Sequence, residues 1–226
     1  MIPSPELNIW EHSASLKELC YRRAMGLEPE MDAALQAAQI LKELDLSPTT
    51  TLLDGGCGAG HFIHSLQKRG LNFKYLGVDY SPTIIQIGKK AYQNLGLDPS
   101  CLILESLDDL HDFQFEVAIL LNTLSFNPDF RRPINRLVEC GAKTLLIRDN
   151  FGDTTRIVWE VDGHLDPGAN HLKGYWNTWS RQEMEDFLRL LGFQKISWIQ
   201  DQRTLGQTEL VVGKPYHWEF LLASFA

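Results

Sequence analysis

One segment of the sequence has residue types and spacing that suit a bound nucleoside. An apolar run over residues 51–54 ends in Asp54 and is followed directly by a glycine-dense turn. Gly56, Gly58 and Gly60 lack a Cβ atom, so the backbone there can turn sharply and approach a ligand closely. A helical pattern begins at the next residue. The succession of strand, glycine turn and helix is typical of a cofactor-binding loop.

A second carboxylate lies at the distance expected for a ribose contact. Residues 73–79 have the pattern of a strand that ends in Asp79, which is 19 residues after Gly60. An acidic side chain at this point can accept hydrogen bonds from both ribose hydroxyls. Asp54 would repel the pyrophosphate of a dinucleotide, but it would suit the ammonium group of an amino acid. The two carboxylates together favour a ligand that joins a ribose to an amino acid.

Strands and helices alternate along the chain, which predicts an α/β fold. Apolar segments rich in branched residues occupy positions 51–54, 74–79, 101–105, 115–121 and 144–148. Two later strands are expected at 193–200 and 208–213, and the short interval between them requires antiparallel pairing. We therefore expect a Rossmann-like sheet of seven strands, mostly parallel, with an antiparallel terminal hairpin and helices on both faces.

Helix starts can be recognised from their capping residues. Ser81 precedes a proline that suits the first turn of a helix, and Ser180 forms a capping box with Glu183. Pro133 is expected to open the helix that leads to residue 141. Residues 13–45 carry a helical apolar stripe that is interrupted near residues 26–29, which predicts an N-terminal helical cap with a break at that point.

Composition limits the partners and the location that we expect. The chain has 21 Lys and Arg against 29 Asp and Glu, a net charge of −8, and no long basic cluster, so a nucleic acid is not an expected partner. The longest apolar run, 117–121, is too short for a membrane span, and residues 1–6 do not resemble a signal peptide, so we expect a cytoplasmic protein. Four scattered cysteines without metal-ligand spacing predict free thiols and no metal site.

These features together resemble class I S-adenosylmethionine-dependent methyltransferases over roughly residues 50–213. The resemblance implies S-adenosylmethionine as the cofactor. It places Asp54, Gly56 and Gly58 at the methionine end of that cofactor, with Gly60 in the same turn. The GxGxG order also differs from the GxGxxG turn of nicotinamide-dependent oxidoreductases.

The resemblance also assigns the remaining cofactor contacts. Asp79 would bind the ribose, with Tyr80 beside the adenine. Ser106 and Leu107 lie in the segment that resembles the adenine-binding loop of the family, although Ser106 stands where an aspartate is often found. Two further candidates come from outside this loop, Asn122 at the end of the fourth strand and Arg23, whose cation could pair with the cofactor carboxylate.

The segment after the fifth strand is expected to bind the methyl acceptor, because it is much longer than an ordinary connection. Methyl transfer is an in-line displacement, so a base is optional. The catalytic candidates are Asp149 and His171, and the substrate-binding candidates are Asn150, His164, Tyr175 and Trp176. For Asp149 a helix or turn cap is an equally supported role, and the tryptophans of this segment could instead pack the insertion onto the sheet.

The sequence thus predicts a single domain, 1–226, in four parts. They are an N-terminal helical cap (1–48), a cofactor-binding core (50–148), an acceptor-binding insertion (149–179) and a C-terminal helix, hairpin and tail (180–226). The expected partner is a small aromatic or apolar acceptor methylated on nitrogen or oxygen. The apolar tail 216–222 is expected to pack against the sheet or in a homodimer contact. Two alternatives stay open: a nicotinamide-dependent oxidoreductase and a non-catalytic S-adenosylmethionine-binding protein.

Overall fold

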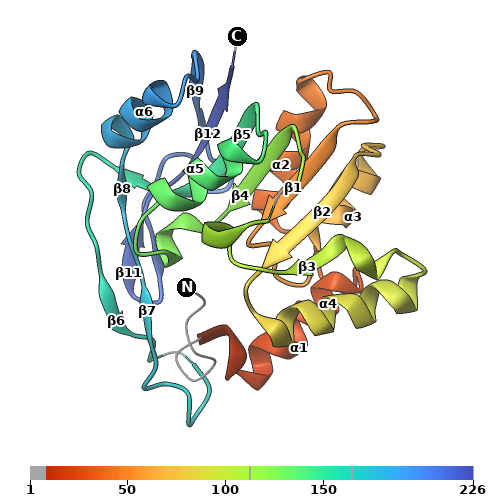
Figure 1. The fold of residues 1–226 in the computed structure, drawn as a ribbon. Helices are drawn as coiled ribbons and strands as arrows, with labels where there is room; N and C mark the ends of the chain where they lie inside the picture. Colours follow the sequence, from red (N-terminus) through yellow and green to blue (C-terminus); the bar gives the residue numbers. More distant parts are fainter. Residues whose placement is uncertain (1–8, 112, 164, 226) are drawn as a thin grey trace.

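A computed structural model describes residues 9–111, 113–163 and 165–225. Its central sheet has the strand order β3-β2-β1-β4-β5-β12-β9 (Figure 1). The bounds of these strands, from one edge to the other, are β3 Leu102–Leu104, β2 Lys74–Asp79, β1 Thr51–Gly55, β4 Val117–Leu121, β5 Thr144–Gly152, β12 Trp218–Ser224 and β9 Lys195–Gln200. An eighth strand of two residues, β8 (Trp179–Ser180), pairs with the end of β5.

The sheet is parallel from β3 to β5, and β12 runs antiparallel to both of its neighbours, β5 and β9. This confirms the mostly parallel sheet. The expected hairpin between 193–200 and 208–213 is wrong, because β10 (Glu209–Val211) pairs instead with β11 (Lys214–Tyr216) in a separate two-stranded sheet. The physical reason lies in burial: Leu210 in β10 is 73% exposed, whereas the tail provides a long apolar strand. The tail is thus β12 itself.

Helices cover the two faces of the sheet separately. One core cluster joins α5 (Arg131–Glu139) and α6 (Arg181–Leu190) to the face of β1 that carries Leu53. The other joins α2 (Asp32–Glu43), α3 (Phe62–Lys68) and α4 (Pro82–Leu95) to the face that carries Leu52. Successive strand residues point to opposite faces, so an unbroken apolar strand can serve both cores.

Most of the capping residues act as expected. The Ser81 side chain accepts from the Ile84 backbone amide at the start of α4, and the Ser180 side chain accepts from the Glu183 amide at the start of α6. Pro133 does not open α5, since that helix begins two residues earlier at Arg131. A proline fits there because the first-turn amides of a helix have no partner inside the helix.

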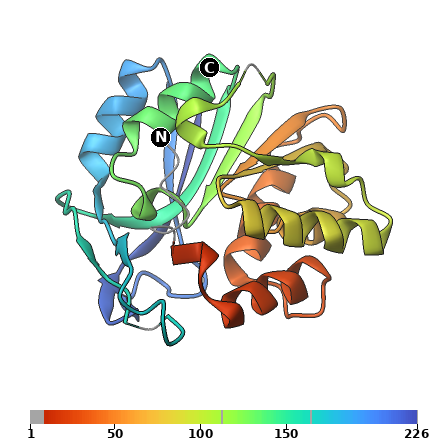
Figure 2. The same cartoon turned by 60° about the horizontal axis from the view of Figure 1, so that its bottom comes forward.

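The N-terminal residues form a cap over one end of the sheet. A short 3-10 turn, η2 (Ile9–Glu11), leads into α1 (Ala14–Ala24), which packs along α4 in both views (Figures 1 and 2). Gly26 has a φ of +68° in the connection between α1 and α2, so the predicted break is confirmed. Residues 1–8 of the expected cap lie outside the described residues.

The segment after β5 is partly strand and partly insertion. β5 continues to Gly152, four residues beyond the expected end, so residues 149–152 belong to the sheet. Beyond it, β6 (Trp159–Val161) and β7 (Lys173–Tyr175) form an antiparallel hairpin. None of the helices in the described ranges has the length and apolar character that crossing a bilayer requires.

Candidate cofactor and acceptor site

A cavity of about 220 Å³ lies at the carboxyl ends of β1, β2 and β4. The carboxyl ends of parallel strands are where open α/β sheets bind their ligands. Its lining comes from separate parts of the chain, namely η2 and α1, the glycine turn, the end of β2, residues 105–108 and residues 121–127. Of the ten predicted cofactor residues, eight line this cavity: Arg23, Gly56, Gly58, Asp79, Tyr80, Ser106, Leu107 and Asn122.

The glycine turn has a conformation and a packing that only glycine satisfies. Gly56 has a φ of +72°, and a Cβ atom there would lie 2.6 Å from the Thr123 side-chain oxygen. Gly60 does not line the cavity. Its φ is +79°, a Cβ atom would lie 2.7 Å from the Tyr92 hydroxyl, and that hydroxyl donates to the Gly60 carbonyl. Gly60 therefore allows the turn to pack against Tyr92, outside the cavity lining.

Asp79 connects the two loops that meet at the cavity. Its Oδ2 accepts from the Gly58 amide at 2.9 Å and its Oδ1 accepts from the Ser81 amide at 2.9 Å. Burial raises the pKa of Asp79 above its usual value, although these backbone hydrogen bonds oppose the rise. Each carboxylate oxygen has a second lone pair, so the side chain can still accept from a ligand hydroxyl. Tyr80 beside it is hydrogen-bonded to Trp10.

Asp54 lies behind this cavity. Its side chain lines a smaller adjoining cavity of about 40 Å³, which it shares with Gly56, His61 and Asn122. The Tyr75 hydroxyl donates to Asp54 Oδ2 at 2.7 Å. Burial raises the pKa of Asp54 to about 7, and the bond from Tyr75 offsets only part of this rise. A cation in the small cavity would favour the ionised carboxylate.

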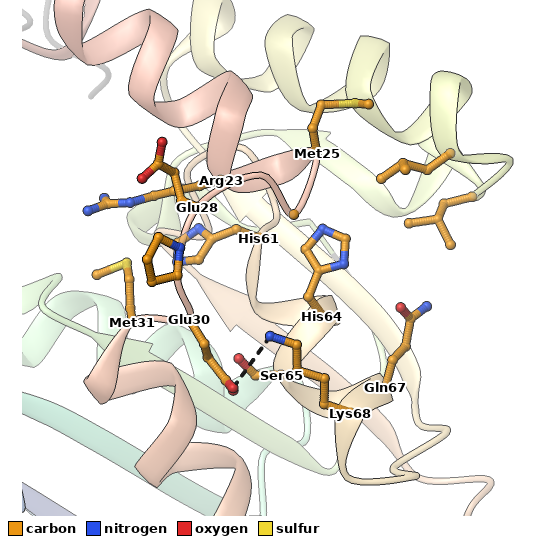
Figure 3. A pocket seen from close by; sticks show the side chains of 14 residues that line it. Arg23, Met25, Glu28, Glu30, Met31, His61, His64, Ser65, Gln67 and Lys68 are labelled. Carbon is orange, nitrogen blue, oxygen red and sulfur yellow. Dashed lines mark ion pairs between the residues drawn. The ribbon is translucent and has the colours of Figure 1, made fainter.

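Arg23 and His61 line both the 220 Å³ cavity and a larger open cavity of about 420 Å³ beneath the α1–α2 connection. Figure 3 shows the two side chains close together at one side of this open cavity. Burial, with the nearby charge of Arg23, lowers the pKa of His61 to about 4, so His61 is neutral at pH 7. Glu30 fixes the connection by ion pairs with Arg69 at 2.6 Å and Lys68 at 3.7 Å. Arg23 places a cation in the lining of the 220 Å³ cavity.

The loop after β4 forms a third wall, and of its residues the sequence analysis named only Asn122 as a site candidate. Asn122, Thr123, Phe126 and Asn127 all line the cavity. Asn122 has a φ of +57°, an uncommon left-handed conformation that often marks functional sites. Phe126 makes an edge-to-face contact with Trp10, with ring centroids 5.4 Å apart. The only sequence signal for this wall was its place after the fourth strand.

The expected adenine loop is a 3-10 turn, η4 (Leu107–Asp109), capped by the Ser106 side chain, which accepts from the Asp108 amide at 3.3 Å. Ser106 and Leu107 line the cavity together with Glu105 and Asp108. Burial raises the pKa of Asp108 despite the nearby charge of Arg132. These carboxyl groups place hydrogen-bond acceptors on this side of the cavity.

Two acceptor-side candidates are buried in the structure and lie outside the cavity lining. Asp149 accepts from the backbone amides of Leu124 at 2.6 Å, Ser125 at 3.1 Å and Asn150 at 2.8 Å. Burial raises its pKa, against the effect of these hydrogen bonds. The Asn150 side chain donates to the Asn177 carbonyl and the Thr178 hydroxyl. This geometry favours a turn-capping role for Asp149 over the role of a base.

The candidates of the insertion also lie outside the cavity lining. His171 is exposed, and Tyr175 is half-buried against Trp159. Trp176 is buried and packs edge-to-face on Phe126, with centroids 5.3 Å apart. His164 lies outside the described residues. The insertion thus contacts the cavity only indirectly in the described residues, because Trp176 packs against Phe126 and Phe126 lines the cavity. In the part of the chain that the structure describes, no three His, Cys, Asp or Glu side chains are grouped to hold a metal ion.

Residues 46–149 match the family model of a methyltransferase domain. The chain is 27% identical over 135 residues to a sterol 4-C-methyltransferase of Caenorhabditis elegans, covering 55% of this chain and 40% of that protein. It is 26% identical over 151 residues to trans-aconitate 2-methyltransferase of Escherichia coli, covering 61% and 56%. The aligned region therefore spans about half the length of these curated relatives.

Solved structures share the fold. An S-adenosylmethionine-dependent methyltransferase from Clostridium acetobutylicum superimposes with a TM-score of 0.62 at 13% identity, covering 92% of this chain and 97% of that one. Magnesium protoporphyrin IX methyltransferase from Synechocystis, solved with bound S-adenosylmethionine, gives a TM-score of 0.61 at 16% identity, covering 99% and 98%.

The fold with a cavity at its strand ends is that of class I S-adenosylmethionine-dependent methyltransferases. Residues 46–149 match the methyltransferase domain family, and a solved structure with the same fold holds bound S-adenosylmethionine. The sequence resemblance is confirmed. The antiparallel β12 between β5 and β9 also departs from the doubly wound sheet of dinucleotide-binding folds, which counts against the nicotinamide alternative.

Proposed function

We propose that the protein binds S-adenosylmethionine in the 220 Å³ cavity and transfers its methyl group to a small molecule. The observation that carries this proposal is that residues from separate segments of the chain line the same cavity. Groups suited to each part of the cofactor come from distant positions in the chain and line one space, including Arg23, Gly56, Asp79 and Leu107.

The order of these groups gives the cofactor a direction. The adenine would lie on the loop that contains Ser106 and Leu107, and the ribose hydroxyls would bind Asp79. The amino-acid end would reach the turn at Gly56, where Arg23 offers a cation for the carboxylate and Asp54 offers an anion for the ammonium. The methyl group would then face the loop after β4, which is the side left open for an acceptor.

The acceptor would lie against an aromatic wall made by Trp10 and Phe126, with the side chain of Asn127 next to it. Aromatic faces bind flat or cationic molecules and exclude water from the reacting centre. We therefore propose a small aromatic or largely apolar acceptor with a nucleophilic nitrogen or oxygen. One structural neighbour is a 1,6-didemethyltoxoflavin-N1-methyltransferase from Burkholderia thailandensis, solved with bound 1,6-didemethyltoxoflavin and S-adenosylhomocysteine.

The enzyme would act mainly by positioning. Among the described residues of the loop after β4, those that line the cavity carry no ionisable side chain. The ionisable lining groups, such as Asp79 and Glu105, come from the cofactor side. In-line displacement at a sulfonium needs a lone pair held close to the methyl carbon, so a neutral amine or an ionised oxygen can react without a protein base.

Two measurements test the proposal. Calorimetry should show that S-adenosylhomocysteine binds more tightly than NAD. Incubation with methyl-labelled S-adenosylmethionine and a metabolite extract should then yield a labelled small molecule. Tight binding without any labelled product would favour the non-catalytic alternative, and preference for NAD would overturn the cofactor assignment.

A further inference from the structure

A buried ion pair lies directly behind the cofactor cavity. Arg148 of β5 is 2% exposed and Asp201, the residue after β9, is 1% exposed. Arg148 Nε donates to Asp201 Oδ2 at 2.6 Å. The guanidinium also lies over the ring of Trp218 in β12, 4.3 Å from its centroid. Three strands of the sheet therefore fix the orientation of one guanidinium.

The end of the Arg148 guanidinium that does not contact Asp201 is hydrogen-bonded to Asn122, which lines the cavity. Arg148 Nη1 donates to Asn122 Oδ1, and the Asn122 backbone amide donates to the Arg148 carbonyl at 2.7 Å. The left-handed backbone of Asn122 is thus tied at both its main chain and its side chain. Arginine has five N–H donors and no acceptor, so the carboxamide atom that faces it must be the oxygen.

This contact decides which end of Asn122 is left for a ligand. The amide nitrogen, Nδ2, is a donor, and within the described chain it has no hydrogen-bond partner. Asn122 lines the small cavity that also contains Asp54, Gly56 and His61. A zwitterionic amino acid would find an anion for its ammonium at Asp54 and an uncharged donor for its carboxylate at Asn122.

We propose that Arg148 and Asp201 are positioning residues that present the Asn122 amide nitrogen to the carboxylate of the cofactor's amino-acid end. The inference rests on the proposed binding of S-adenosylmethionine. A buried ion pair often stabilises a fold no better than apolar residues of the same size, so its value here lies in geometry. The charges of Arg148 and Asp201 also cancel, so the pair does not repel the ammonium group of the bound cofactor.

Stability alone does not explain the arrangement of the pair. Asp201 Oδ1 accepts from the Thr204 amide at 2.9 Å and from the Thr204 hydroxyl at 3.0 Å, which fixes the carboxylate independently of Arg148. The contact between Arg148 and Asn122 then transmits this fixed position to the cavity. Lysine in place of Arg148 would keep the charge but could not make both planar contacts.

The test compares two probes, S-adenosylhomocysteine and 5′-methylthioadenosine, which lacks the amino-acid end. Asn122→Ala and Arg148→Lys should each weaken S-adenosylhomocysteine binding about fivefold or more, and the double variant should lose less than about twofold beyond Asn122→Ala alone. Binding of 5′-methylthioadenosine should change less than about twofold in all three. If the residues had only a structural role, the variants would weaken the binding of both probes, or the double variant would show the product of the two single losses in affinity. Either result overturns the inference.

Two further variants keep the test informative if Arg148→Lys does not fold. Asn122→Asp keeps an oxygen towards Arg148 but removes the donor, so it should weaken S-adenosylhomocysteine alone. Arg181→Lys is the matched control, since its ion pair with Glu219 at 2.6 Å lies outside the cavity lining, and it should leave both affinities within about twofold. A parent protein that fails to bind S-adenosylhomocysteine overturns the proposed function as well, whereas parent binding with unaffected variants overturns this inference only.

Discussion

Asp54 and Tyr75 form a buried hydrogen bond of 2.7 Å between the first two strands, immediately behind the glycine turn. The two residues are diagonal neighbours on β1 and β2, since Leu52 pairs with Tyr75 and Asp54 with Gly77. Burial raises the pKa of Asp54 to about 7. A carboxyl group in this position is protonated to a large extent at neutral pH while the site is empty, and a bound ammonium would ionise it.

Cofactor affinity should therefore depend on pH. The ammonium prefers the ionised carboxylate, so S-adenosylhomocysteine should bind up to about tenfold more weakly for each pH unit below 7 and reach a plateau above it. Calorimetry between pH 5.5 and 8 measures this. Asp54→Asn should flatten the profile, and an unchanged profile in that variant would assign the dependence to another group, such as Asp79.

The same carboxyl group should affect stability with the opposite trend. Its pKa in the folded protein, about 7, lies above the value of 3.8 for the free side chain. Its contribution is therefore fully present below about pH 4 and is lost as pH rises through 7, a change on the order of 4 kcal/mol. Denaturant unfolding of the cofactor-free protein at pH 5 and pH 8, compared with Asp54→Asn, measures the part of this change between those pH values, about 2–3 kcal/mol. Equal pH dependence in the two proteins would contradict the assignment.

Asp79 should account for a large part of the cofactor affinity. Asp79→Asn keeps one acceptor oxygen but removes the charge, so hydrogen bonds from ribose hydroxyls should weaken by about 1.5–3 kcal/mol, or roughly 10-fold to 150-fold in Kd. Ser81→Ala serves as the control, because it removes the cap of α4 but no ligand contact. A loss of less than twofold for Asp79→Asn, with the thermal midpoint unchanged, would make Asp79 a structural residue.

Phe126 should affect the acceptor more than the cofactor. Phe126→Ala removes the ring that joins Trp10 to Trp176, so the aromatic wall should open. We expect S-adenosylhomocysteine affinity within about threefold of the parent and labelled-product formation reduced by about tenfold or more. Phe126→Leu, which keeps most of the volume, should retain more activity. Comparable losses in cofactor binding would show that the ring belongs to the cofactor site.

Asp149→Asn separates a base from a cap. The Asp149 carboxylate accepts from three backbone amides, two of them at the start of the loop after β4, and an amide can replace only part of this. We expect a destabilisation of about 1–3 kcal/mol with little change in turnover per folded molecule. Turnover reduced by ~100-fold at an unchanged thermal midpoint would instead support Asp149 as a general base.

Local features of the site could be predicted because they depend on neighbouring residues. The positive φ angles of Gly56, Gly58 and Gly60 require glycine whatever packs around them. Asp79 ends its strand at a spacing that the strand–helix–strand unit fixes. These elements carry their own conformational preferences, so order and spacing were sufficient to predict which part of the domain forms this side of the cavity.

Strand pairing and side-chain contacts between distant residues were decided only by tertiary structure. Strand periodicity alone could not show that β12 and not β10 would pair with β9, because that choice depends on which apolar strand the two cores can bury. Arg148 and Asp201 are 53 positions apart, and their contact exists only because β5 and β9 flank β12. Phe126 lines the cavity although the sequence did not predict it, and Asp149 lies outside the lining although the sequence made it a candidate. Both results follow from the short turn after β4, which folds over the end of β5. A sequence specifies the types of its side chains and its local geometry, whereas the partner of each buried polar group follows from how distant segments satisfy one another in the core.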